Sequence, residues 1–363
     1  MGRQRMGRRR TGLRWAAGVI GVASAFAMTA CGGGPSGPAT VRTAQAKAAS
    51  ELYDAAKSEG TVMVYGPFQS TYKPLYDQFT KKYPGVTVKT TDLFGPPLTA
   101  RLQAETATGK VGADLLATGP VDLGLYAQKG WLTSYKPDGS AALHQKYVGA
   151  GNFYVEPLLA EATMFYNTGA VQPAGLPKTW ADLQDPKWKG KLALPDPAIP
   201  GLSSQSLAAA QKAGVIDDKG LKSLADNATK YATVPAAIQA VATGQKPIGL
   251  LAAYQLINNA SGSGAPVKYF TLDDGTPATG TGYAVLAKAR HPNAAMLLSA
   301  WLLTAEAQKG IGELGLQGTT PNAPAPAGGL PGLPDLKIIN MDLPAADLSS
   351  AQKNLTSIFG DGG

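Results

Sequence analysis

The feature that most constrains the fold of this 363-residue chain is a regular alternation of helix-like and strand-like segments between residues 51 and 117. Apolar residues recur at helical spacing in the helix-like segments, and short apolar runs follow Gly or Pro turns. The predicted order is a helix over 51–59, a strand over 61–65, a helix over 72–82, a strand over 86–90, a helix through 98–105 and a strand over 113–117. This order is typical of an α/β lobe with a mostly parallel sheet.

The length and the cysteine content limit how such a fold is held together. About 330 residues after the N-terminal region exceed what one hydrophobic core usually serves, so we expect two lobes. Cys31 is the only cysteine, which excludes an intramolecular disulfide. Hydrophobic cores alone must therefore stabilise both lobes.

The first 30 residues have the organisation of an export signal. Six arginines precede an apolar run over residues 15–28, which is shorter than the roughly 20 residues that cross a bilayer core. Met28-Thr29-Ala30-Cys31 then resembles the lipobox of bacterial lipoproteins. The sequence predicts a signal peptide over 1–30, lipidation at Cys31, a flexible tether over 31–50 and an extracytoplasmic protein anchored to the cell membrane. The export route and the number of host membranes stay open.

The net charge does not favour a nucleic-acid partner. The whole chain has a formal charge of +8, but the signal region alone carries six of its arginines and no acid. The remaining chain has 27 basic and 25 acidic residues, with no run of lysines or arginines. We therefore expect no binding to nucleic acid.

Loops that follow the predicted strands are the first candidate ligand contacts. Ligands of α/β sheets bind beyond the carboxyl ends of the strands, where helix N-termini offer free N–H groups. Each of three loops here couples a turn residue to a helix start. Their candidate residues are Phe68, Gln69, Thr71, Gly95, Thr118 and Gly119. Ordinary helix-capping turns are the alternative interpretation.

The second half of the chain carries a distinctive passage, with YNT at 166–168, LPKTWADL at 176–183 and DPKWKGKLALPDP at 185–197. This series resembles the ferric-iron-type branch of bacterial extracellular solute-binding proteins, the receptors of ABC importers. The similarity extends to residues 52–60, 130–132, 292–295 and 305–308, and covers nearly everything from residue 51 to about 325. Trp180 and Trp188 are expected to pack in the core rather than to stack on a ligand.

The resemblance implies an α/β fold of two lobes, the type II periplasmic-binding-protein or Venus-flytrap fold. Lobe 1 would comprise residues 51–167 and 276–330, lobe 2 residues 168–275, and a C-terminal tail and helix residues 331–363. The strand-like segments 163–167 and 282–287 are the candidate crossovers between the lobes. The implied protein is a monomer that captures a small solute and delivers it to an ABC permease in the membrane.

The second lobe adds three candidate contacts, Ser203 and Ser204 at a helix start and Tyr254 after a strand. The two serines can instead serve as helix caps. Iron-binding members of the family have adjacent tyrosines near this place, whereas Tyr254 is flanked by Ala253 and Gln255. Tyr254 would be a metal ligand only if the cargo were ferric iron, which prefers several hard oxygen donors. The cargo therefore stays open between ferric iron and a small organic or phosphorylated anion or a polyamine, and no cofactor is expected.

An exported hydrolase is the competing class of protein, and the sequence contains few of the motifs that such an enzyme would need. No G-x-S-x-G, H-E-x-x-H or P-loop motif occurs. His144 and His291 are expected at the surface, and Asp273 and Asp274 in a solvated turn. A flytrap sensor that signals to a membrane partner is a further alternative. We expect a binding protein and no enzyme.

Overall fold

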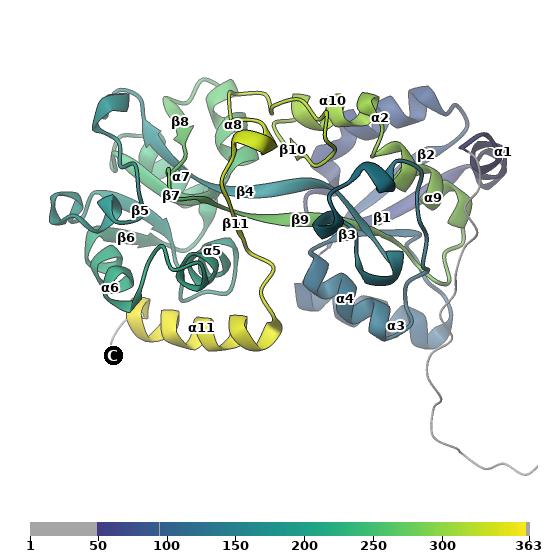
Figure 1. Ribbon diagram of the computed structural model, residues 1–363, viewed down its shortest axis with the longest axis horizontal. Coiled ribbons are helices and arrows are strands. Elements are labelled where there is room, and N and C mark those ends of the chain that lie inside the picture. The colour runs from purple at the N-terminus through teal and green to yellow at the C-terminus, as the bar shows by residue number, and fades with distance from the viewer. Residues whose placement is uncertain (1–48, 94, 361–363) are drawn as a thin grey trace, which may run out of the picture. The chain divides into compact units, whose positions relative to one another are not determined.

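The computed structural model describes residues 49–93 and 95–360 (Figure 1). The predicted signal peptide, Cys31 and almost all of the predicted tether lie outside the described residues. Among the described residues, no helix combines the length and the apolar character that crossing a membrane requires.

The first lobe is built on the parallel strands that the alternation predicts. Strand β1 (Thr61–Gly66) lies between β2 (Thr87–Asp92) and β3 (Leu115–Thr118), parallel to both. The helices that alternate with them are α1 (Ala49–Glu59), α2 (Lys73–Lys82), α3 (Gly95–Thr108) and α4 (Pro120–Gln128). The predicted order of helices and strands is confirmed, with boundaries displaced by a few residues.

The second lobe repeats this plan. Strand β5 (Leu192–Pro195) lies between β6 (Ala228–Tyr231) and β7 (Ile248–Ala253), again parallel to both. Its helices are α5 (Leu202–Lys212), α6 (Asp218–Asn227), α7 (Val234–Ala242) and α8 (Tyr254–Gly262). Strand β8 (Val267–Phe270) completes it and pairs antiparallel with β4 (Val155–Asn167).

Two long strands, β4 and β9 (Thr276–Val285), join the lobes and run side by side in Figure 1. Residues 155–161 of β4 pair with β9, whereas residues 162–167 pair with β7 and β8. Strand β9 continues beyond β4 to pair with β3. The predicted crossover segment 163–167 belongs to β4, and most of 282–287 belongs to β9, but the shared stretch of the two strands lies at 155–161 and 278–283.

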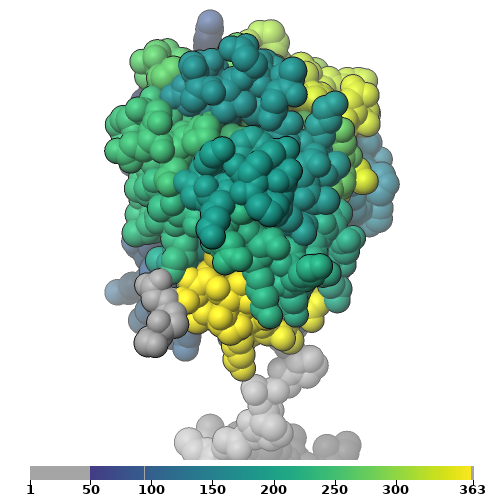
Figure 2. Space-filling view, turned by 90° about the vertical axis from the view of Figure 1, so that its left-hand side faces the viewer, coloured from purple at the N-terminus to yellow at the C-terminus, as the bar shows by residue number. Residues whose placement is uncertain are grey.

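The C-terminal residues pack into the second lobe. Strand β11 (Ile338–Asn340) pairs with β9, and helix α11 (Ala345–Phe359) lies against α5 and α6. Leu355 and Phe359 are buried in the same core cluster as Trp180 and Trp188. Figure 2 shows the C-terminal part of the chain in yellow against the teal and green surface of the lobe. The predicted C-terminal helix is confirmed, and its apolar face, which a free tail would expose, is covered.

The late helices return to the first lobe. Helices α9 (Pro292–Trp301) and α10 (Ala305–Glu313) pack on α1 and α2, and the short strand β10 (Gln317–Gly318) pairs with β4. Glu59 at the end of α1 accepts the backbone N–H groups of Asn293 and Ala294 at the start of α9. Two segments of the family resemblance, 52–60 and 292–295, are therefore in direct contact.

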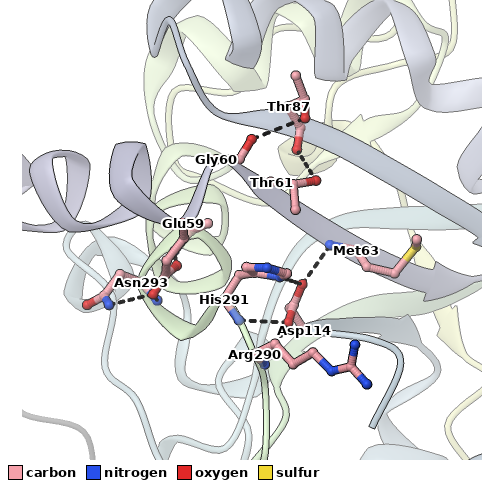
Figure 3. A network of polar contacts seen from close by, with 10 residues as sticks. Glu59, Gly60, Thr61, Met63, Thr87, Asp114, Arg290, His291 and Asn293 are labelled. Carbon is pink, nitrogen blue, oxygen red and sulfur yellow. Dashed lines mark hydrogen bonds and ion pairs between the residues drawn. The ribbon is translucent and has the colours of Figure 1, made fainter.

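Asp114 forms a second link between early and late sequence (Figure 3). Its carboxylate, almost completely buried, accepts the N–H groups of Met63, Arg290 and His291, each at 2.9 Å. His291 Nδ1 lies 2.8 Å from the same carboxylate. His291 is only partly at the surface, where the sequence predicts it: its side chain is 28% exposed, and its ring is held against a buried acid.

The Trp180 passage is fixed by the turn at residues 273–275. The Trp180 N–H donates to the Asp274 carboxylate at 2.9 Å, and the indole N–H donates to the Gly275 carbonyl at 3.2 Å. Trp180 is fully buried, as predicted. Asp273 is exposed, as predicted, whereas Asp274 is half-buried and accepts a backbone donor of the passage.

Candidate functional site

Loops at the carboxyl ends of both parallel sheets supply the candidate site. Strands β1, β2 and β3 end at Gly66, Asp92 and Thr118, and each is followed by a helix start. Strands β5, β6 and β7 end at Pro195, Tyr231 and Ala253 and are likewise followed by α5, α7 and α8. In open α/β sheets, ligands bind at these edges.

A small cavity joins the two edges beside the crossing strand β4. Its volume is about 40 Å³. Its walls are the loop after β1, strand β4, the junction of β7 and α8, and Leu316. The lining residues are Phe68, Tyr72, Ala160, Glu161, Ala253, Tyr254, Gln255, Leu256 and Leu316. Of the predicted contacts, Phe68 and Tyr254 lie together here, although 185 positions separate them along the chain.

The loop after β1 holds Phe68 in an unusual conformation. Phe68 has φ 57°, in the left-handed region that residues with a side chain seldom adopt. Its side chain is 49% exposed. The Thr71 N–H and hydroxyl donate to the Phe68 carbonyl at 2.9 and 2.7 Å. Thr71 therefore stabilises the turn that presents the phenyl ring to the cavity, and this ordering of a strained backbone is typical of functional loops.

Gln69 anchors the same loop to the core. Its side chain is completely buried, and its amide donates to the Pro67 carbonyl at 2.9 Å. Its amide oxygen accepts the Tyr76 hydroxyl, which in turn lies 3.1 Å from the Tyr283 hydroxyl. Both ends of the Gln69 amide thus have partners within the first lobe.

Tyr254 begins α8 and is only 1% exposed. Its hydroxyl donates to the Ala327 carbonyl, and its ring packs edge-on against Tyr269 with the centroids 5.0 Å apart. Burial raises the pKa of Tyr254 to about 12. The residue contributes ring surface to the cavity, while its hydroxyl is occupied by the segment before β11.

Glu161 on β4 is the charged residue among the lining residues that the sequence did not predict. Its side chain is 2% exposed, and Oε1 has no hydrogen-bond partner among the described residues. Burial raises the pKa of Glu161 to about 8. The available signal was an acid within the apolar run 158–165, since a strand buried on both faces rarely carries a charge.

The remaining first-lobe candidates do not line this cavity. Thr118 is buried, and its hydroxyl lies 3.5 Å from a carboxylate oxygen of Asp122. Burial raises the pKa of Asp122. Gly119 precedes the first turn of α4, and Gly95 begins α3 with φ 61°. Among the described residues, no atom lies within 4 Å of a Cβ built at either glycine.

Ser203 and Ser204 lie in the first turn of α5, also away from the cavity. The Ser204 hydroxyl accepts the Gly201 N–H at 2.9 Å and donates to the Gly201 carbonyl at 3.0 Å. Ser204 therefore closes the helix start, the alternative role that the sequence left open. The Ser203 hydroxyl is buried without a hydrogen-bond partner among the described residues.

The acidic and imidazole side chains of the described residues form no metal-binding cluster. No three His, Cys, Asp or Glu side chains within 49–93 and 95–360 lie close enough to hold a metal ion. His144 is exposed, as predicted, and its Nδ1 accepts the Lys146 N–H.

Comparison with known proteins identifies the family. The model of the family described as bacterial extracellular solute-binding protein matches residues 65–309, about two thirds of the chain. The chain belongs to this family. No curated protein matches it by sequence.

Solved structures of type II periplasmic binding proteins share the two-lobed fold. Iron-bound HitA from Pseudomonas aeruginosa superposes with a TM-score of 0.66 at 22% identity, covering 82% of this chain and 99% of its own. AfuA from Actinobacillus pleuropneumoniae, solved with fructose-6-phosphate, has a TM-score of 0.64 at 22% identity, covering 82% and 97%. An ABC-transporter substrate-binding protein from Agrobacterium tumefaciens has a TM-score of 0.69 at 16% identity, covering 84% and 96%. The predicted α/β flytrap fold is confirmed.

Proposed function

We propose that this protein is the extracytoplasmic receptor of an ABC importer and that it binds its solute in the cavity beside β4. The observation that carries this proposal is that both strand-end edges and the crossing strand line one cavity. A solute that contacts both lobes stabilises the closed arrangement, and a permease then recognises that arrangement. Binding requires no catalysis, in keeping with a family of binding proteins.

We further propose a small organic solute rather than ferric iron. Tyr254 has no tyrosine beside it in the sequence, and its hydroxyl donates to the Ala327 carbonyl, so the pair of adjacent tyrosines that the resemblance associates with iron is missing. The fold itself accommodates both kinds of cargo, since HitA was solved with iron and AfuA with fructose-6-phosphate. Phe68 and Tyr254 would contact the solute directly, with Gln69 and Thr71 supporting the loop.

The helix starts at Gly95, Thr118, Gly119, Ser203 and Ser204 are proposed contacts of the closed form. They follow strand ends on the two sheets that the solute would join. Their N–H groups, together with the unpaired Ser203 hydroxyl, suit polar or anionic groups of a larger solute.

The membrane attachment is part of the proposal. A signal peptide over residues 1–30, acylation of Cys31 and a tether over 31–50 would keep a monomeric receptor near its permease. One acyl chain binds a membrane weakly, so stable anchoring requires more than one chain.

Thermal unfolding of the full chain in detergent, followed by tryptophan fluorescence, tests the receptor function. The probes are ferric citrate, phosphate, glucose-6-phosphate, putrescine and glucose. A solute at 100 times its Kd should add about 2.7 kcal/mol, a midpoint increase of a few degrees. Phe68→Ala should abolish the increase, whereas the surface control Asp77→Asn should preserve it.

Two results would contradict the proposal. An increase that survives Phe68→Ala would place the solute outside this cavity. An increase with ferric citrate alone, lost on Tyr254→Phe, would restore iron as the cargo.

A further inference from the structure

Glu161 is a buried acid in the wall of the candidate site, and one of its two carboxylate oxygens is unpaired among the described residues. It lies on β4, opposite Ala278 of β9, and is 2% exposed. Its Oε1 has no hydrogen-bond partner within the described residues. Buried polar atoms are nearly always paired, and a carboxylate oxygen without a partner is costly to bury. A folded protein that keeps such a group at a ligand cavity points to a partner supplied by the ligand.

The rest of the cavity wall carries no charge. Its side chains are aromatic, aliphatic or, at Gln255, a neutral amide. The titratable groups facing Glu161 are the hydroxyls of Tyr72 and Tyr254. Burial raises the pKa of both tyrosines, that of Tyr254 to about 12, so both are neutral near pH 7. No cation of the cavity wall can neutralise Glu161 or an incoming anion.

We propose that this cavity receives an ammonium group of the solute, with Glu161 as its counterion. The inference rests on the receptor function proposed above and names the chemical class of the solute. A carboxylate accepts charge-assisted hydrogen bonds from an alkylammonium. The electron-rich faces of Phe68 and Tyr72 stabilise the same cation.

The two sides of the cavity differ in polarity. The first turn of α8 forms one side, and its free N–H groups and helix dipole disfavour a cation there. The ammonium group therefore binds on the β4 side, against Glu161. A carbonyl or anionic group of the same solute suits the N-terminus of α8.

The size of the cavity limits what enters it. A cavity needs roughly 10–15 Å³ to hold one water molecule. This cavity of about 40 Å³ therefore holds some three groups of that size. An ammonium group with one or two carbons fits, whereas a sugar ring does not. The terminal alkylammonium enters the cavity, and the remainder of the solute extends between the lobes.

Binding should depend on pH in a specific direction. Burial raises the pKa of Glu161 to about 8, so the empty site holds mostly the protonated acid at pH 7. An ammonium group favours the carboxylate and lowers this pKa, so binding releases a proton. Affinity should rise with pH by up to tenfold per unit between pH 6 and 8 and level off above pH 8.

Titration calorimetry of the full chain in detergent tests the inference. The ammonium probes are putrescine and ethanolamine; 1,4-butanediol and ethylene glycol are their uncharged counterparts, and citrate and phosphate are the anions. The measured quantities are the Kd from pH 6 to 9 and the proton release, from two buffers that differ in ionisation enthalpy. Glu161→Gln keeps the side-chain shape, and Glu306→Gln, an exposed partner of Lys82, is the matched control.

At least one ammonium probe should bind the wild type at pH 8 with proton release at pH 7. Glu161→Gln should weaken it by roughly 10- to 150-fold and abolish the pH dependence, while Glu306→Gln changes neither. Ammonium binding that is unchanged in Glu161→Gln would overturn the inference. Binding of anions alone would also overturn it while leaving the receptor function intact, and failure of every probe, anions included, would count against both.

Discussion

Replacing Asp114 by alanine should lower the free energy of unfolding by about 4 kcal/mol. The substitution removes the acceptor of three backbone N–H groups at 2.9 Å and the partner of His291 Nδ1 at 2.8 Å. Each of these partly buried amides, left without its acceptor, costs about 1–1.5 kcal/mol. The half-exposed imidazole can rehydrate and adds little. These groups connect β1, β3 and the segment before α9, so the loss acts on the whole first lobe.

Urea unfolding of the full chain, followed by tryptophan fluorescence, measures this loss. Trp301 reports on the first lobe because it packs on Phe79 at 5.4 Å. A decrease of about 4 kcal/mol should lower the midpoint by 1 M or more. Asp114→Asn, which keeps one acceptor oxygen, should lose about half as much.

The matched control is Asp77→Ala, which removes an exposed ion pair with Lys73 and should cost less than about 0.5 kcal/mol. A loss below about 1 kcal/mol in Asp114→Ala would refute the reasoning. Equal losses for the alanine and asparagine variants would also refute it, because the retained oxygen should satisfy part of the network.

Three further predictions follow from the site and the N-terminal region. Burial raises the pKa of Glu161 to about 8 in the folded protein, against about 4.3 in an unfolded chain. Folding stability should therefore fall by up to about 5 kcal/mol as pH rises from 4.3 to 8. The thermal midpoint should fall less with pH in Glu161→Gln than in the wild type, and the same pH profile in both would contradict the prediction. Tyr254→Phe should lower the free energy of unfolding by about 1 kcal/mol, because the bond to the Ala327 carbonyl is lost, and should speed proteolysis near Ala327. Neither the wild type nor the variant should be coloured; a colour present in the wild type and lost in the variant would instead indicate iron. Cys31→Ala should end labelling with radioactive palmitate in bacteria and move the protein to the soluble fraction, whereas persistent labelling would exclude Cys31 as the acylated residue.

The local pattern of the chain was sufficient for most of the fold. Helices and strands of the first lobe followed from apolar spacing and from glycines such as Gly60 and Gly109, which stop the preceding helices. Both have positive φ, where glycine carries no steric penalty. The division of β4 between two sheets was harder to predict, because it depends on which distant strands lie beside each half.

The site was only partly predictable for the same reason. Phe68 could be predicted as a contact because it lies in a loop that follows a strand. The environment of Tyr254 depends on Ala327, which lies 73 residues further along the chain. Glu161 could not be singled out from the sequence, because it lies within an apolar run. Only the three-dimensional arrangement shows that one of its carboxylate oxygens is unpaired among the described residues.

The position of Glu161 also suggests how binding and closure are linked. The acid lies on a strand that belongs to both sheets, at the last residue that pairs with β9. Without solute, desolvation keeps this group protonated near pH 7, because a carboxylate there would have no counterion. An ammonium group offsets that cost where the surrounding walls exclude water, and the loop of Phe68 and the start of α8 supply these walls. The ion pair would then strengthen with closure, so the lobes and the solute would stabilise one another.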